Sequence, residues 1–183
     1  MRRKIGIYLL IIFIILILVP LLLVKEQDDE KIVLRVYNHQ LDKIVEMELN
    51  QYLRGVLAAE MPARYHPEAL KAQAVAARTY TLKQLPRYGG SRNSAYKGAD
   101  VSTDYRECQA YFSEREMKDR WGFIPFFYYW SRINTAVEET AKQVLVYDGK
   151  LIDAVYHANS GGRTENAEYV WGRNTPYLKS VES

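Results

Sequence analysis

The chain has 183 residues, of which 48% are hydrophobic and 13% aromatic, and its 25 lysines and arginines against 22 acidic residues give a formal net charge of +3. This composition supports a hydrophobic core and excludes an intrinsically disordered chain. The excess charge comes from Arg2, Arg3 and Lys4, so residues 25–183 are neutral overall. A nucleic-acid-binding domain needs a concentrated basic face on its folded part, and this balance argues against one.

Residues 5–24 form an uncharged apolar run of the length that crosses a membrane. At about 1.5 Å per residue, a helix of this length spans roughly 30 Å, the thickness of a bilayer core. A cleaved signal peptide would have a shorter apolar centre and small residues before the cut. We therefore expect an uncleaved, single-pass transmembrane anchor in the cell membrane. The basic tip, residues 1–4, keeps the N-terminus in the cytoplasm, which places the charged linker 25–31 and one domain, 32–183, outside.

The domain is expected to begin with a β-hairpin. Residues 32–37 and 41–49 are two extended runs, and the second alternates apolar and polar positions with the period of a half-buried strand. Asn50 is a suitable N-cap for a helix over 51–61, which must end before Pro62.

A second, alanine-rich helix is expected from Pro67 to about Leu85, where Pro86 ends it. Residues 86–106 have few aliphatic side chains and are expected to be irregular.

The next segment, 121–130, is rich in aromatic residues, and Pro125 argues against one continuous element there. A helix is expected over 131–142. Two extended runs then flank Asp148 and Gly149, a strong signal for a two-residue hairpin turn. Strands, helices and strands follow one another, so the expected fold class is α+β, with antiparallel hairpins and packed helices.

The first predicted helix carries the most informative residue. Leu53, Val56 and Leu57 mark its apolar stripe, and Glu60 falls on the same stripe. Residues 51–97 hold eight basic residues against two acidic ones. An acidic side chain that faces a core among cations is either ion-paired or chemically active, and ion pairing is the more common case.

Other candidates for chemistry are weaker. Cys108 and His157 would supply two metal ligands, which do not make a site, so no metal and no cofactor are expected. Ser160 precedes two glycines, whereas a nucleophile elbow requires a glycine before the serine. A loop lined by backbone groups is the better interpretation of this segment. The aromatic residues of 121–130 are typical of a core or an interface, and would also suit stacking on sugar rings.

Several ordered blocks resemble one family. They are LAAEMP at 57–62, EALKAQAVAARTY at 68–80, CQAY at 108–111, HANSGGRTENAEYVWG at 157–172 and PYLKSV at 176–181. Together they are similar to the stage II sporulation protein D family, a set of membrane-anchored peptidoglycan lytic transglycosylases that act during engulfment of the forespore. Related domains occur in an enhancer of cell-wall amidases.

The resemblance implies a role for each matched residue. Glu60 would be the catalytic acid, which protonates the glycosidic oxygen and then removes the proton of the 6-hydroxyl of muramic acid, closing a 1,6-anhydro ring. A hydrolase normally needs a second carboxylate, and here the hydroxyl of the sugar replaces it. The implied substrate-binding residues are Gln73, Arg78 and Tyr80 along the groove and Ser160, Gly161, Gly162 and Thr164 in a loop opposite, where backbone donors would hold the glycan.

The resemblance also implies partners and an alternative function. The expected substrate is glycan strands stripped of stem peptides by a cell-wall amidase, and the expected neighbours are that amidase and other engulfment membrane proteins. The alternative is a non-catalytic module that binds peptidoglycan and recruits or enhances an amidase. Family members usually continue well beyond the last block, so the catalytic domain 32–183 is expected to be incomplete at its C-terminus.

Overall fold

The structure is a computed structural model that describes Phe13, residues 31–91 and residues 96–183. All the elements named below belong to one compact unit, Ile32–Ser183. The predicted anchor apart from Phe13, its basic tip and almost all of the linker lie outside the described residues. Within the described part of the chain, no helix combines the length and the apolar character needed to cross a membrane.

A small sheet of three strands opens the unit, and it confirms the predicted hairpin. Strand β1 (Val33–Asn38) pairs antiparallel with β2 (Lys43–Glu48). The short strand β3 (Val101–Ser102) pairs with the other edge of β1 in parallel. This parallel pairing was not predicted, because a two-residue strand inside a segment without aliphatic runs gives no local signal. Leu34 and Val36 of β1 point into the core and are fully buried.

Helix α2 (Leu49–Glu60) begins directly where β2 ends. The Leu49 N–H donates to the Ile32 carbonyl at 2.8 Å, so the backbone passes from strand to helix without a loop. The N-cap position is occupied by Glu48, whose side chain makes no capping hydrogen bond. The prediction of Asn50 as N-cap was wrong, since Asn50 lies inside the helix and its side-chain oxygen accepts a hydrogen bond from Arg78.

Helix α3 (Pro67–Lys83) confirms the second predicted helix, with a proline in its first turn. His66 caps it through its ring Nδ1, which accepts from the Glu68 N–H. A single 3-10 turn, η1 (Pro86–Tyr88), follows.

Helices α4 (Glu114–Trp121) and α5 (Phe123–Glu139) form a corner at Gly122. Helix α4 was not predicted, although Ser113 and Glu116 form a capping box at its start. The aromatic segment 121–130 is not one continuous element, as predicted, but the break lies at Gly122 and α5 runs through Pro125. Pro125 sits in the first turn, where a backbone N–H has no partner within the helix and its absence costs little.

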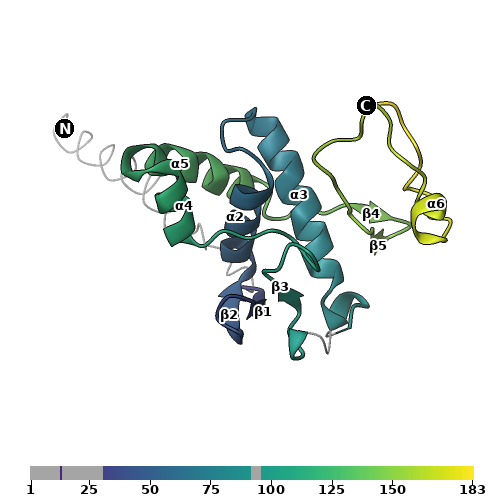
Figure 1. Ribbon diagram of the computed structural model, residues 1–183, viewed down its shortest axis with the longest axis horizontal. Helices are drawn as coiled ribbons and strands as arrows, with labels where there is room; N and C mark the ends of the chain where they lie inside the picture. The colour runs from purple at the N-terminus through teal and green to yellow at the C-terminus, as the bar shows by residue number, and fades with distance from the viewer. Residues whose placement is uncertain (1–12, 14–30, 92–95) are drawn as a thin grey trace, which may run out of the picture. The chain divides into compact units, whose positions relative to one another are not determined.

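The C-terminal part carries a short hairpin, β4 (Val146–Tyr147) and β5 (Lys150–Leu151), and helix α6 (Ala167–Trp171). Asp148 and Gly149 have φ angles of 48° and 71°, which confirms the predicted two-residue turn. Figure 1 shows this hairpin and α6 on one side of α3, with α2 on the other side.

The core lies where α2, α3 and α5 pack together above the sheet (Figure 1). Its fully buried side chains include Leu53, Val56 and Leu57 of α2, Ala74 and Ala77 of α3, and Ile133 and Val137 of α5. Alanine at the buried positions of α3 lets its neighbours approach closely. The α+β class is confirmed, and the core fixes the end of α2, where Glu60 lies.

Candidate functional site

Glu60 is the last residue of α2, and its side chain is partly buried. Of the apolar stripe predicted for this helix, Leu53, Val56 and Leu57 are fully buried. Glu60 Oε1 accepts a hydrogen bond of 2.8 Å from the Ala110 N–H. A backbone donor therefore fixes one carboxylate oxygen of a residue that the sequence places on the core-facing side of its helix.

The segment that carries Ala110 is held against α2 by a close backbone approach at Gly55. The Phe112 N–H donates to the Gly55 carbonyl at 3.1 Å. A Cβ atom at Gly55 would lie 2.2 Å from the Tyr111 ring and 2.7 Å from the Phe112 carbonyl oxygen. Only glycine leaves room for this approach, which brings the Ala110 N–H to Glu60.

Tyr156 adds a phenol beside Glu60. Burial, followed by the charge of the Glu60 carboxylate, raises the pKa of the Tyr156 phenol, and a hydrogen bond with Glu60 contributes to the same shift. The phenol therefore keeps its proton at neutral pH. Its oxygen accepts a hydrogen bond of 2.9 Å from Gln109 Nε2, and Gln109 Oε1 accepts one of 2.8 Å from the Thr81 hydroxyl.

This chain of contacts links Glu60 through Tyr156 and Gln109 to α3. The sequence analysis assigned no role to Tyr156 or Gln109. Gln109 lies in the CQAY block, which was a usable signal, whereas Tyr156 stands in a strand-like run whose pattern gives no hint of its partner 47 positions away.

A second group of polar side chains surrounds Cys108. Burial, followed by the neighbouring Cys108 thiol, raises the pKa of the Tyr80 phenol to about 12. The same two causes raise the pKa of Tyr96. Within the residues that the structure describes, no three His, Cys, Asp or Glu side chains gather as they would around a metal ion.

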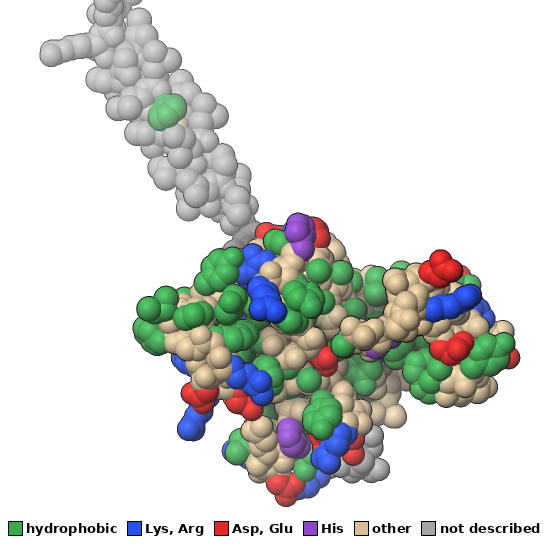
Figure 2. All heavy atoms as spheres, turned by 45° about the horizontal axis from the view of Figure 1, so that its top comes forward, with side chains coloured by type: hydrophobic (Ala, Val, Ile, Leu, Met, Phe, Trp, Pro, Cys, Tyr) green, Lys and Arg blue, Asp and Glu red, His purple; other side chains and the backbone are tan. Residues whose placement is uncertain are grey.

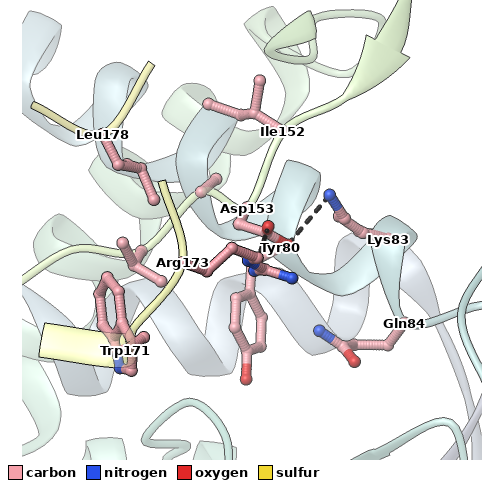
Figure 3. Close-up of a pocket in the computed structure, with 10 residues that line it drawn as sticks. Tyr80, Lys83, Gln84, Ile152, Asp153, Trp171, Arg173 and Leu178 are labelled. Atoms are coloured by element: carbon pink, nitrogen blue, oxygen red, sulfur yellow. Dashed lines mark hydrogen bonds and ion pairs between the residues drawn. The ribbon is translucent and has the colours of Figure 1, made fainter. Parts of the chain in front are cut away.

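Tyr80 also lines a cavity of about 390 Å³. Figure 3 shows Trp171 on one side of this cavity and Lys83 and Gln84 on the other. Asp153 lies between two cations: its carboxylate contacts Lys83 Nζ at 2.9 Å and Arg173 at 3.1 Å. The remaining lining residues are Ile152, Ala154, Val155 and Leu178.

Gln73 lies on the same helix as Tyr80, two turns earlier, and is partly buried. Its amide nitrogen Nε2 is buried and has no hydrogen-bond partner among the described residues. A buried donor without a partner costs free energy unless a ligand or water satisfies it. Gln73 is therefore a suitable contact for a bound polar molecule.

Arg78 has a different environment from the one that the resemblance implies. Its side chain is only 2% exposed. One guanidinium nitrogen donates to Asn50 Oδ1 at 2.8 Å and another to the Val137 carbonyl at 2.9 Å. The structure does not place Arg78 in a groove: this cation joins α3 to α2 and α5 inside the core.

Residues 161–163 of the loop Ser160–Thr164 are exposed, and Gly161 and Gly162 adopt the expected left-handed backbone, with φ angles of 69° and 97°. Three of its backbone donors are already in use. The Gly161 N–H donates to Asn159 Oδ1, the Gly162 N–H to Ser160 Oγ, and the Thr164 N–H to the Val181 carbonyl. In this arrangement the loop offers no free N–H at these positions for the glycan contacts that the resemblance implies.

The arrangement supports proton transfer by a single carboxyl group. Glu60 receives a backbone hydrogen bond and adjoins a protonated phenol. Tyr80, which contributes to the electrostatic environment of Tyr156, also lines the cavity. The cavity combines apolar walls with a charged rim.

Comparison with known proteins identifies a family. The family described as SpoIID, Stage II sporulation protein, matches residues 37–147. The chain is 39% identical to stage II sporulation protein D of Bacillus amyloliquefaciens over 160 residues, which are 87% of this chain and 44% of that protein. The corresponding protein of Bacillus subtilis is 39% identical over 152 residues, 83% of this chain and 43% of that protein.

A relative with a different name also matches. The amidase enhancer of Bacillus subtilis is 38% identical over 127 residues, which are 69% of this chain and 14% of that protein. In each of these three comparisons the chain covers less than half of the relative.

Proposed function

The chain belongs to the stage II sporulation protein D family, and from that premise we propose that it is a membrane-anchored lytic transglycosylase that cuts peptidoglycan glycan strands during sporulation. The proposed substrate is strands without stem peptides, and the products carry 1,6-anhydro-muramic acid ends. The names of the relatives support a role in sporulation and, through the amidase enhancer, a link to the cell wall.

The observation that carries this proposal is the environment of Glu60. A single carboxyl group must first give a proton as the acid and later take one as the carboxylate, and both steps need a fixed position. The Ala110 N–H fixes Oε1 at 2.8 Å. Tyr156 stays protonated beside the carboxylate because of burial and the charge of Glu60.

The proposed reaction uses these contacts in two steps. Protonated Glu60 gives its proton to the glycosidic oxygen as the bond to the leaving sugar breaks. The resulting carboxylate, stabilised by the Ala110 N–H and the Tyr156 phenol, then takes the proton of the 6-hydroxyl as that oxygen closes on the anomeric carbon. The sugar supplies its own nucleophile, so the second carboxylate of a glycosidase is not needed.

Substrate contacts would come from α3 and the cavity. The unpartnered amide nitrogen of Gln73 suits an acetamido or hydroxyl oxygen of the glycan. The indole of Trp171 and the apolar walls suit the faces of a sugar ring, and the Lys83–Asp153–Arg173 group suits its hydroxyls.

The test is a comparison of two isosteric variants. The full chain should release 1,6-anhydro products from glycan strands without stem peptides. Glu60→Gln should abolish this release, and Glu46→Gln, at an exposed position on β2, should leave it unchanged. Equal product release by both variants would refute the role of Glu60.

The match to the amidase enhancer favours a second candidate, a non-catalytic module that binds peptidoglycan and recruits or stimulates a cell-wall amidase. This function predicts glycan binding that persists in Glu60→Gln and no cleavage by the unmodified chain. A pull-down with insoluble peptidoglycan, run beside the product assay, separates the two.

A further inference from the structure

The start of α5 exposes a group of large apolar side chains to solvent. Phe123, Ile124, Phe127 and Tyr128 are 73%, 82%, 56% and 61% exposed. We refer to these four residues as the aromatic corner, because they occupy the turn where α4 meets α5. Figure 2 shows hydrophobic side chains gathered at this end of the molecule. Large exposed apolar patches on soluble domains usually mark a binding surface.

The aromatic corner is rigidly attached to the core. The ring of Phe123 meets that of Phe127 edge to face, with centroids 5.1 Å apart, and Phe127 meets Phe126 at 5.5 Å. Phe126 is 4% exposed and stacks on Trp130 at 5.9 Å. The exposed rings therefore continue a packed aromatic cluster. Because their side chains are already ordered, burying these rings against a binding partner would cost little conformational entropy.

The charges around the corner are basic. Residues 120–137 contain Arg120 and Arg132 and no acidic residue. Arg132 lies over the Tyr128 ring at 5.7 Å and is fixed by a hydrogen bond of 2.8 Å to the Ala63 carbonyl. Arg120 lies over the Phe112 ring at 4.1 Å. Helix α4 is mixed, because its Lys118 and Arg115 pair with Glu114 and Asp119.

We propose that the aromatic corner docks into the surface of a bilayer that contains anionic lipids. The corner has phenyl and aliphatic side chains at its tip, tyrosine and tryptophan behind them and arginines beside them. This order matches the change in polarity from the acyl chains to the headgroups of a bilayer. The inference rests on the membrane-anchored part of the proposed function. The linker 25–31, at about 3.5 Å per residue, keeps the domain within roughly 25 Å of the predicted anchor.

Docking would set the orientation of the domain. Attachment through the linker alone does not set the direction in which the site faces, whereas a second attachment at the corner would fix the position of α2 and α3 relative to the bilayer. A weak second attachment is sufficient because the predicted anchor makes it intramolecular.

The experiment uses the full chain in lipid nanodiscs with an environment-sensitive fluorophore on one cysteine. Cys108→Ser removes the native thiol, and Phe123→Cys or Ile124→Cys places the label at the corner. Tyr105→Cys is the matched control, because Tyr105 has the same exposed fraction as Phe123, 73%. Quenchers attached to the lipid headgroup region report contact with the bilayer, and a glycan substrate is not needed.

The corner labels should shift to shorter wavelength and be quenched in phosphatidylglycerol discs, and the label at 105 should not. An arginine near an anionic surface is worth roughly a fivefold factor in affinity, so Arg120→Gln should weaken docking about fivefold. Equal quenching at 123, 124 and 105 would overturn the proposal. A shift at 123 that needs two copies per disc would assign the corner to self-association and also overturn it.

Discussion

Replacing Gly55 by alanine adds one methyl group where α2 meets the segment that carries Ala110. The new Cβ would lie 2.2 Å from the Tyr111 ring and 2.7 Å from the Phe112 carbonyl oxygen. Ordinary contact distances start at about 3.5 Å. The ring can rotate, but the carbonyl belongs to the backbone, so the segment must move by roughly 1 Å.

The energetic outcome is a difference between two effects. Overpacking of this kind costs about 1–3 kcal/mol, and alanine in place of glycine inside a helix contributes about 1 kcal/mol of stability. Gly55→Ala should therefore lose up to about 2 kcal/mol, a fall in Tm of at most about 8 °C for a chain of this size. The expected effect on the rate of glycan cleavage is larger, because a displacement of about 1 Å at the proposed catalytic group would lower that rate about 100-fold.

Two measurements check this prediction. Thermal unfolding gives the change in stability, with Gln51→Ala, at an exposed position of the same helix, as the control. Hydrogen exchange gives the protection of the Ala110 N–H, which should fall in Gly55→Ala and stay unchanged in the control. A Gly55→Ala chain that is more stable by about 1 kcal/mol, with full protection at Ala110, would refute the close approach at Gly55.

Three further changes have outcomes that the contacts determine. Arg78→Ala removes a buried cation and two hydrogen bonds and should destabilise the fold by about 3 kcal/mol. The control Arg64→Ala, at an exposed position, should change stability by less than about 0.5 kcal/mol. Chemical denaturation measures the free energy of unfolding of both variants. Tyr156→Phe should keep the fold but reduce glycan cleavage about 100-fold, because Glu60 loses a donor; a rate within twofold of the native one would remove Tyr156 from the mechanism. Hydrogen bonds from Arg106 hold the pKa of Asp104 at about 2, below its ordinary value of 3.8. The ionised Asp104 therefore stabilises the folded chain above pH 3.8, and this contribution disappears as the pH falls toward 2. Acid unfolding curves of Asp104→Asn should lack that part of the pH dependence.

Local signals predicted most of the helices and turns. The Asp148–Gly149 turn and the start of α3 at Pro67 follow from backbone preferences of one or two residues, and both are present. Pro125 misled the prediction, because the same residue that breaks a helix interior is tolerated in a first turn, and the sequence does not show where the helix starts.

Long-range partners could not be predicted in the same way. The periodicity of α2 placed Glu60 on the core-facing stripe, but its donor belongs to a residue 50 positions later. In the sequence, Arg78 is one cation of a family motif. The structure shows that its partners are the Asn50 side chain and the Val137 carbonyl, which is 59 positions away. The roles of such residues depend on tertiary packing, which local patterns do not encode.

The central claim is that Glu60 acts with a hydroxyl of the sugar and without water. Cleavage of glycan strands in water enriched in heavy oxygen tests it directly, with mass spectrometry of the new chain ends. The account predicts 1,6-anhydro ends that are lighter than hydrolytic ends by one water and carry no label, and no products from Glu60→Gln. Reducing ends that carry the heavy oxygen would show that water is the nucleophile and would contradict the account.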